Sequence, residues 1–327
     1  MHEATKAPRV SFFDYIVIGG GTTGIPIATT LSANYSVLLL ERGGSPYNDA
    51  NITKAENFGL YFLDTSQDSP VQQFVVEGVA NGRARVLGGG TSINAGFYSR
   101  GEKQFNKEAR LKDEDLIQDS YEWTEKVMVF DQDVQNWQSA VGAGLVEAGV
   151  TPDNGFTYDH LVGTKVGGAI FDKNGTRHTA ADLLQYANPE GLSLFLHATL
   201  KAKGLWSSVR RYARTKHVAY LKREKNNEII LSAGALGSPQ LLMLSGIGPK
   251  DQLDALNIKI VLEQPFVGQD MADNPLNVLF IPSPIGVERS LVQVAGITPF
   301  GSYIEAIGGF NVIFVNLSDY QGYTPEV

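Results

Sequence analysis

"DYIVIGGGTTGIPIATTLSANYSVLLLERGG", residues 14–44, carries the pattern that decides the fold. Its first apolar run, Tyr15–Ile18, is rich in β-branched residues and predicts a strand that is buried on both faces. Ala, Ile and Leu then recur at helical spacing from Ile25 to Ser32, and Val37–Leu40 predicts a second buried strand. The stretch therefore predicts a βαβ unit of about thirty residues.

Between the first strand and the helix, Gly19, Gly21 and Gly24 form the pattern G-x-G-x-x-G. In dinucleotide-binding folds the first glycine permits a tight turn, the second lets the backbone approach a pyrophosphate, and the third lets helix and strand pack closely. Glu41 follows at the end of the second strand, where a carboxylate can bind ribose hydroxyls. An ordinary glycine-rich turn is the alternative, but the ordered strand, helix, strand and acid favour a dinucleotide site.

Composition limits the function classes. The chain has 327 residues, of which 43% are hydrophobic, so we expect a large core and two domains. Its formal charge of −8 argues against nucleic acid as a partner, and no apolar run is long enough to predict a membrane span. No signal peptide is evident. With no cysteine, a disulfide framework and a thiol nucleophile are excluded, whereas compartment and oligomeric state stay open.

Two further motifs are rich in small residues. "RARVLGGGTSINAGFYSR" (83–100) would let a flat or bulky group lie against the main chain, although a glycine turn before a helix is the alternative. "AGALGSPQLLMLSGIGP" (233–249) predicts a helix that begins at Ser238-Pro239. Other predicted elements are helices over 113–127 and 136–148, strands over 167–171, 192–200 and 228–232, and a loop-rich stretch over 45–82.

The three motifs, in this order, resemble the glucose–methanol–choline (GMC) flavoprotein oxidoreductases, and within them the plant branch of mandelonitrile lyases and HOTHEAD-like proteins. "DKNGTRHTAADLL", "LHATL" and "VGQDMADNP" extend the resemblance over nearly the whole chain from about Asp14. The resemblance implies FAD as cofactor. It implies an α/β fold, with a doubly wound, Rossmann-like FAD-binding domain and an incomplete antiparallel-sheet substrate domain.

The resemblance also implies roles for individual residues. Thr22 and Thr23 would lie in the phosphate loop, and Glu41 with Arg42 at the adenosine ribose. The remaining implied contacts, to the pyrophosphate, the isoalloxazine ring and the adenine, fall on Val86, Gly90, Asn94, Ala95, Gly96, Phe97 and Leu200. Three alternatives without a cofactor contact stay open: Phe97 as a core aromatic, Arg42 as a solvated charge and Leu200 as a residue that serves packing alone. Asp273, Asn274 and Pro275 match a motif that approaches the flavin from the substrate side.

Catalysis is harder to locate. Hydride transfer from an alcohol needs a base, commonly a histidine with a pKa near neutrality. The family's catalytic histidine lies in a motif that none of His2, His160, His178, His197 and His217 matches, so we expect a C-terminally truncated chain without it. We expect His2 and His217 to face solvent, and His197 to be either a core residue or a site residue.

The implied substrate is a small-molecule alcohol or a cyanohydrin. The alternatives are an alcohol oxidoreductase, a hydroxynitrile lyase, or a non-catalytic flavoprotein. We expect an FAD-binding domain over 1–275, with a substrate-side insertion at about 113–159, and the start of a substrate domain over 276–327. One stretch departs from the family: 201–221 carries a basic tract at 210–216 where relatives have an apolar β-hairpin.

Overall fold

A computed structural model describes residues 1–76, 79–201, 205–210 and 213–309. It is built around a five-stranded parallel sheet with the strand order β1-β11-β4-β3-β15. These strands are β1 (His2–Glu3), β11 (Leu192–Leu196), β4 (Val37–Leu40), β3 (Tyr15–Ile18) and β15 (Glu228–Leu231). The two strands predicted from the βαβ unit are confirmed to the residue. Helix α1 (Gly24–Leu31) connects them, one residue earlier than predicted at each end.

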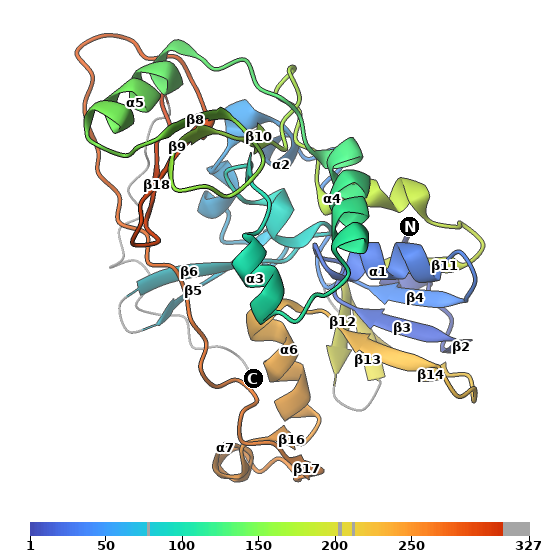
Figure 1. Cartoon of the computed structure of the whole chain (residues 1–327). Coiled ribbons are helices and arrows are strands. Elements are labelled where there is room, and N and C mark those ends of the chain that lie inside the picture. The colour runs from blue at the N-terminus through green and yellow to red at the C-terminus, as the bar shows by residue number, and fades with distance from the viewer. Residues whose placement is uncertain (77–78, 202–204, 211–212, 310–327) are drawn as a thin grey trace.

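The two faces of this sheet are covered differently (Figure 1). On one face, Ile25, Ala28 and Leu183 join Val17 and Leu39 in the largest buried cluster. These helical residues come from α1 and from the 3-10 helix η5 (Ala180–Tyr186), and α4 (Glu114–Met128) packs beside them. The α/β fold is thus confirmed, with helices on this face.

A second sheet covers the other face, where Ile16, Leu38 and Leu40 pack against Ala198 and Ala219. It has the order β12-β13-β14-β2. Its strands are β12 (Ala198–Lys201), β13 (Leu205–Arg210), β14 (Ala213–Leu221) and β2 (Val10–Phe13). The departure expected over 201–221 is wrong for the backbone, because β13 and β14 pair antiparallel as a hairpin despite the basic tract. Residues 211 and 212 of that tract lie outside the described part.

One residue separates the two sheets. We predicted a continuous strand over 192–200, but the chain leaves the parallel sheet at His197, whose φ is +52°. The His197 N–H donates to the Gly43 carbonyl, and the Ala198 N–H donates to that of Glu41. A left-handed residue cannot continue a strand, so β12 starts in the other sheet.

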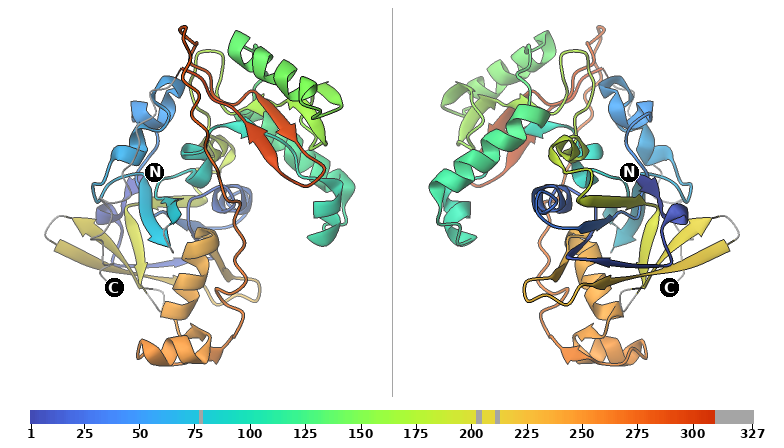
Figure 2. Two further views of the ribbon diagram at one scale, coloured as in Figure 1. Left: turned by 90° about the vertical axis from the view of Figure 1, so that its left-hand side faces the viewer. Right: turned by 90° about the vertical axis from the view of Figure 1, so that its right-hand side faces the viewer.

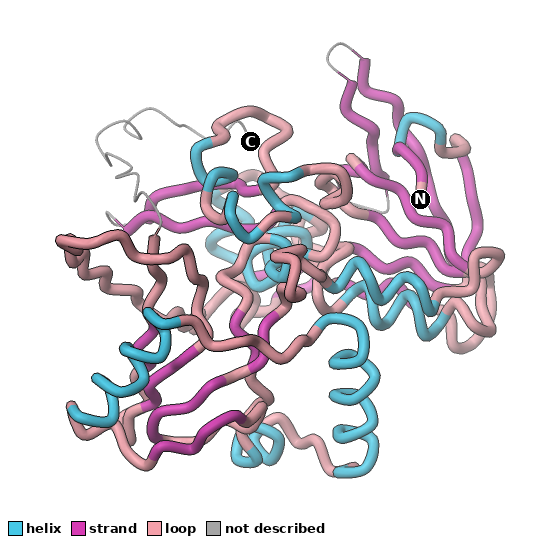
Figure 3. Tube along the Cα trace, turned by 90° about the horizontal axis from the view of Figure 1, so that it is seen from above, coloured by secondary structure: helices cyan, strands magenta, loops and turns pink. Residues whose placement is uncertain are grey.

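A third, mixed sheet stands apart from the first two (Figures 2 and 3). Its order is β19-β18-β9-β8, with β8 parallel to β9 and the other pairs antiparallel. The strands are β19 (Tyr303–Glu305), β18 (Val294–Ile297), β9 (Gly163–Val166) and β8 (Asp153–Phe156). The antiparallel sheet expected from Leu276 therefore starts later, because residues 276–289 form no helix or strand. Residues 310–327 of the predicted substrate domain lie outside the described residues.

Helix α5 (Asn136–Glu147) packs on this third sheet, and Gln138 fixes the contact. Its Oε1 accepts the N–H groups of Gln293 and Val294 at 3.1 and 3.2 Å, and its Nε2 donates to Ser290 Oγ and the Ala306 carbonyl. Gln138 is fully buried.

Replacing Gln138 by leucine is expected to lower the free energy of unfolding by about 2 kcal/mol, because buried partners then lose their hydrogen bonds. Urea-induced unfolding measures the change. Gln104→Leu, on an exposed face of α3 (Lys103–Glu108), is the control and should stay within about 0.5 kcal/mol of the wild type. Equal effects of the two substitutions would contradict the role of Gln138.

The remaining elements are short. The stretch predicted as loop-rich holds a hairpin that we did not predict, β5 (Val71–Val76) and β6 (Val79–Ala84). Helix α6 (Gly234–Leu244) begins four residues before Ser238, so Pro239 lies inside it. Ser238 Oγ accepts the Ala233 N–H at 3.1 Å, which supports the extra turn. The others are α2 (Ala50–Thr53), α7 (Lys250–Ala255), β7 (Phe97–Tyr98), β10 (Gly168–Ala169), β16 (Ile247–Gly248), β17 (Leu262–Glu263), η1 (Ala4–Lys6), η2 (Ala55–Asn57), η3 (Leu60–Leu63) and η4 (Gly89–Ser92).

Candidate functional site

The first glycine turn joins β3 to α1 and is packed backbone against backbone. Gly19 has φ +104°, and a Cβ on it would lie 2.3 Å from the Ser232 carbonyl oxygen at the end of β15. A Cβ on Gly24 would lie 1.9 Å from the Gly19 carbonyl oxygen. The positive φ of Gly19 fits the tight turn that the sequence predicted for the first glycine, and the close approach at Gly24 fits the strand–helix packing predicted for the third.

The second glycine segment lies directly on the first. The Gly88 N–H donates to the Gly20 carbonyl at 2.8 Å, and a Cβ on Gly89 would lie 2.8 Å from Gly21 Cα. Gly90 is exposed and has no other atom within 4 Å of a built Cβ, so it leaves open space beside this contact. Motifs that are about 66 residues apart in sequence thus form one surface of nearly bare backbone, which we call the glycine cradle (residues 19–24 and 87–90).

The helix end of the glycine cradle carries free donors. Thr22 and Thr23 are exposed, and Thr22 Oγ1 donates to the Gly88 carbonyl at 3.4 Å. Within the described residues, the N–H groups of Gly21 and Thr22 donate no hydrogen bond. These two residues lie just before α1, whose N-terminus carries partial positive charge that favours an anion such as a phosphate.

Glu41 lies at the carboxyl end of β4, beside the glycine cradle. Its Oε2 accepts the Gly20 N–H at 2.8 Å and its Oε1 accepts the Gly43 N–H at 2.6 Å. Burial raises the pKa of Glu41, although these two N–H groups oppose the shift. The carboxylate therefore fixes the turn from within, and each oxygen keeps a further lone pair for a hydroxyl donor.

Arg42 is half-buried and bonds to β5. Its Nη1 donates to Gln72 Oε1 at 2.9 Å, so the alternative of a purely solvated charge is wrong. Burial, with Arg83 and Arg85 nearby, lowers the pKa of Arg42 to about 10.

Residues 94–97 continue from the glycine cradle. Asn94 is exposed, and a Cβ on Gly96 (φ +86°) would lie 2.5 Å from the Phe171 ring. Phe97 is half-buried in β7, where a Cβ on Gly167 would lie 2.4 Å from its ring. This packing agrees with the reading of Phe97 as a core aromatic.

Lys165 lies beneath Phe97, with Nζ 5.7 Å from the ring centroid. It is fully buried and donates to Ser99 Oγ and the Asp159 carbonyl, and burial lowers its pKa to about 8. Nothing in the sequence pattern singled out this lysine.

The two remaining predicted residues are apolar. Val86 is buried and forms a parallel bridge with Gly44, which anchors the second glycine segment beside β4. Leu200 is half-buried in β12 and packs against the cluster between the two sheets, as its packing alternative expected. Asp273 lies farther out, exposed on an extended segment, and accepts a hydrogen bond from Asn81 at 3.3 Å.

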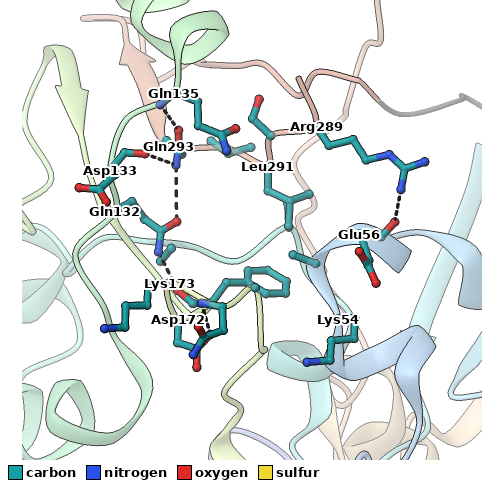
Figure 4. Close-up of a pocket in the computed structure, with 18 of the residues that line it drawn as sticks. Lys54, Glu56, Gln132, Asp133, Gln135, Asp172, Lys173, Arg289, Leu291 and Gln293 are labelled. Atoms are coloured by element: carbon teal, nitrogen blue, oxygen red, sulfur yellow. Dashed lines mark hydrogen bonds between the residues drawn. The ribbon is translucent and has the colours of Figure 1, made fainter. Parts of the chain in front are cut away.

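A cavity of about 530 Å³ opens beside Ala95 (Figure 4). Phe171 and Leu291 contribute apolar side chains to its lining, and Lys54, Glu56 and Arg289 lie on one side. On the opposite side Gln293 bonds to the Gln135 N–H, Gln132 and the Asp133 carbonyl. Ala95 was predicted from the sequence as a site residue, and residues 172–175 belong to a stretch that carries the family resemblance. The other lining residues come from segments without a motif, so the sequence did not predict the cavity as a whole.

None of the five histidines lines this cavity. His217 was expected to face solvent, which is wrong: it is 1% exposed, because β14 pairs with β2 there, and its Nδ1 lies 3.0 Å from the Pro8 carbonyl oxygen. His197 Nδ1 lies 2.7 Å from Glu3, and His160 Nε2 lies 3.0 Å from Glu102.

His178 lies between two carboxylates. Its Nδ1 is 3.0 Å from Asp182 and its Nε2 is 3.7 Å from Asp172. The hydrogen bond with Asp182 and the nearby charges raise the pKa of His178 above 6.5. Hydrogen bonds lower the pKa of both aspartates below 3.8, although burial opposes this.

This cluster predicts a pH-dependent stability. A raised histidine pKa stabilises the fold below pH 6.5, and that contribution is lost as pH rises through the folded-state value. The lowered pKa values of Asp172 and Asp182 stabilise it above about pH 4 and are lost in acid. The cluster of His178, Asp172 and Asp182 should therefore stabilise the fold most between about pH 4 and pH 6.5. Urea-induced unfolding measured from pH 5 to 8 tests this prediction. In His178→Gln the free energy of unfolding should decline less steeply above pH 6.5 than in the wild type. The same pH dependence in both proteins would contradict the role of His178.

Comparisons with known proteins agree with this geometry. Residues 176–276 match the family model described as GMC oxidoreductase. The protein HOTHEAD of Arabidopsis thaliana is 51% identical over 92% of this chain and 52% of its own length. The (R)-mandelonitrile lyase-like protein of the same plant and a sinalpyl alcohol oxidase of Nesocodon mauritianus are each 46% identical, over 93% of this chain and 58% and 57% of their own lengths.

Among solved structures, a formate oxidase of Aspergillus oryzae, studied for FAD modification, has a TM-score of 0.61 at 21% identity, covering 81% of this chain and 52% of that one. This likeness shows the fold. The chain spans about half the length of the relatives named above. Within the described residues, no helix is long and apolar enough to cross a membrane. On the family match, the high identity to its plant members and the shared fold, the chain belongs to the GMC oxidoreductases, in the branch of HOTHEAD and the mandelonitrile lyase-like proteins.

Proposed function

We propose that this chain binds FAD in the glycine cradle, with the flavin ring toward Asn94–Phe97 and the substrate in the cavity beside Ala95. The observation that carries the proposal is the contact between the two glycine segments at the carboxyl ends of parallel strands. Ligands of open α/β sheets bind outside these strand ends, and a pyrophosphate needs close approach to the backbone. The free N–H groups at the start of α1 fit a phosphate.

The roles of individual residues follow from this placement and are part of the proposal. Gly19, Gly21, Thr22, Thr23, Gly24, Val86 and Gly90 would surround the pyrophosphate; Glu41 and Arg42 would lie at the ribose, Leu200 at the adenine, and Asn94, Ala95, Gly96 and Phe97 at the ring. We also propose the domain division into 1–275 and 276–327. The third sheet supports a substrate side built from two chain segments, 153–166 and 294–305.

The reaction class proposed first is oxidation of an alcohol CH–OH group, for which bound FAD supplies the hydride acceptor. The protein would hold the substrate in the polar cavity and exclude water there. A hydroxynitrile lyase-like activity is the second candidate, because relatives with both kinds of name are equally similar to this chain. The small-molecule partner is accordingly an alcohol or a cyanohydrin.

We propose that turnover by these residues alone is slow. No imidazole lines the cavity, and the nearest ionisable side chains there are Lys54, Glu56, Asp131, Asp133, Asp172, Lys173 and Arg289. General-base catalysis typically contributes a factor of about 10²–10⁴, so its loss would leave binding with little reaction. A non-catalytic flavoprotein is the limiting case of this reading.

The first experiment is the visible absorbance of the purified chain with and without added FAD. A structured flavin band that stays with the protein through gel filtration is expected. A colourless protein that FAD does not alter would overturn the proposal. Aromatic alcohols and mandelonitrile are then added separately: bleaching without oxygen supports alcohol oxidation, cyanide release supports the lyase, and neither supports the non-catalytic case.

A further inference from the structure

Arg177 is a buried arginine next to the glycine cradle that no predicted role uses. It is 4% exposed and follows the turn after β10, where Phe171 and Arg177 form an antiparallel bridge. Its guanidinium lies over the Phe171 ring, 4.3 Å from the centroid. The side chain is therefore held in one place by stacking as well as by hydrogen bonds.

The guanidinium joins three segments. Its Nε donates to the Ile52 carbonyl at 3.0 Å, and its Nη1 donates to the Thr91 carbonyl at 3.1 Å and to Asn94 Oδ1 at 3.0 Å. None of the ion pairs among the described residues includes Arg177, and burial lowers its pKa to about 10. Burying a charge without a counter-charge costs several kcal/mol. The hydrogen bonds and the ring contact of Arg177 must therefore offset this cost.

The bond to Asn94 has a chemical consequence. Arginine carries only donors, so the group of Asn94 that faces Arg177 must be the carbonyl oxygen. The amide Nδ2, with two donors, then faces the other way. Asn94 is exposed, and Gly90, four residues earlier, has no other atom within 4 Å of a built Cβ.

We propose that Arg177 is a positioning residue: it holds residues 91–94 and turns the Asn94 amide so that Nδ2 donates to the bound cofactor. This inference rests on the proposed function for the identity of the cofactor. The holding of the segment itself is independent of it.

The first test uses the protein without FAD. The N–H groups of Ile93 and Asn94 both donate to the Gly90 carbonyl, at 3.1 and 3.0 Å, and their hydrogen exchange reports whether the segment is held. Arg177→Met should speed exchange of both amides at least tenfold, and Arg177→Lys by less. Arg223→Met, at an exposed arginine, is the matched control and should change neither. Unchanged exchange in Arg177→Met would overturn the proposal.

The second test measures FAD affinity by absorbance titration. Asn94→Asp keeps an acceptor for Arg177 but has no amide donor, so it should keep slow exchange and still weaken FAD binding at least tenfold. Arg177→Met should weaken binding similarly, and adding Asn94→Ala to it should cost no more than Asn94→Ala alone, because both remove the same oriented donor.

The outcomes separate the two ideas. If Asn94→Asp binds FAD like the wild type, or if the losses in Arg177→Met and Asn94→Ala multiply in the double variant, the positioning role is wrong while FAD binding stands. If the wild type binds no FAD, the proposed function fails, and the orientation of Asn94 toward a cofactor fails with it. Exchange at Ile93 and Asn94 then still decides whether Arg177 holds the segment.

Discussion

Replacing Gly24 by alanine is expected to lower the free energy of unfolding by about 3–5 kcal/mol and to abolish FAD binding. The added Cβ would lie 1.9 Å from the Gly19 carbonyl oxygen and 2.6 Å from Ser232 Oγ. A backbone carbonyl cannot move aside as a side chain can, so α1 would have to shift away from β3. Urea-induced unfolding and absorbance titration measure the two effects.

The matched control has the opposite expected sign. Gly144 lies exposed within α5, and a built Cβ there has no atom within 4 Å. Gly144→Ala should raise stability by about 0.5–1 kcal/mol, because alanine has the higher helix propensity. If both substitutions had the same small effect, close packing at Gly24 would be disproved.

Glu41→Ala is the second large prediction. Removing the carboxylate leaves the buried N–H groups of Gly20 and Gly43 without their acceptors, each at a cost of about 1–3 kcal/mol, so stability should fall by about 3 kcal/mol. FAD affinity should fall at least about tenfold, which corresponds to about 1.4 kcal/mol.

Glu41→Gln separates the two roles of this side chain. A glutamine keeps one acceptor oxygen and places its amide NH₂ against the other N–H, so it should recover about half of the lost stability. If Glu41→Ala unfolds at the same urea concentration as the wild type, the carboxylate does not fix the turn. If only stability falls, Glu41 serves the fold and not the cofactor.

The sequence predicted those parts of the fold whose signals are local. Strands β3 and β4 and helices α4 and α5 follow directly from apolar periodicity, and the required glycines from the spacing of their motif. The break at His197 could not be predicted, because its left-handed backbone depends on carbonyls from Glu41 and Gly43. Helix α6 was predicted late because proline is commonest in the first helical turn.

The candidate site divides in the same way. The glycine segments were found from their own composition, although their mutual contact is tertiary. Arg177, Lys165 and the cavity residues other than Ala95 were given no role from the sequence, because their contacts are made with other segments of the chain. In a sequence, Arg177 and Lys165 look like ordinary surface charges. The structure distinguishes them because both are buried and neither forms an ion pair among the described residues.

The place of β15 in the central sheet has a consequence for synthesis on the ribosome. Ser232 Oγ donates to the Ile18 carbonyl across 214 positions of sequence, and β15 covers β3 along its full length. At about 5–20 residues per second, the nascent βαβ unit waits on the order of 10–40 s before its neighbouring strand emerges. During that time the edge of β3 that faces away from β4 is unpaired. This chain should therefore depend on a ribosome-associated holdase more than a fold whose neighbouring strands are consecutive.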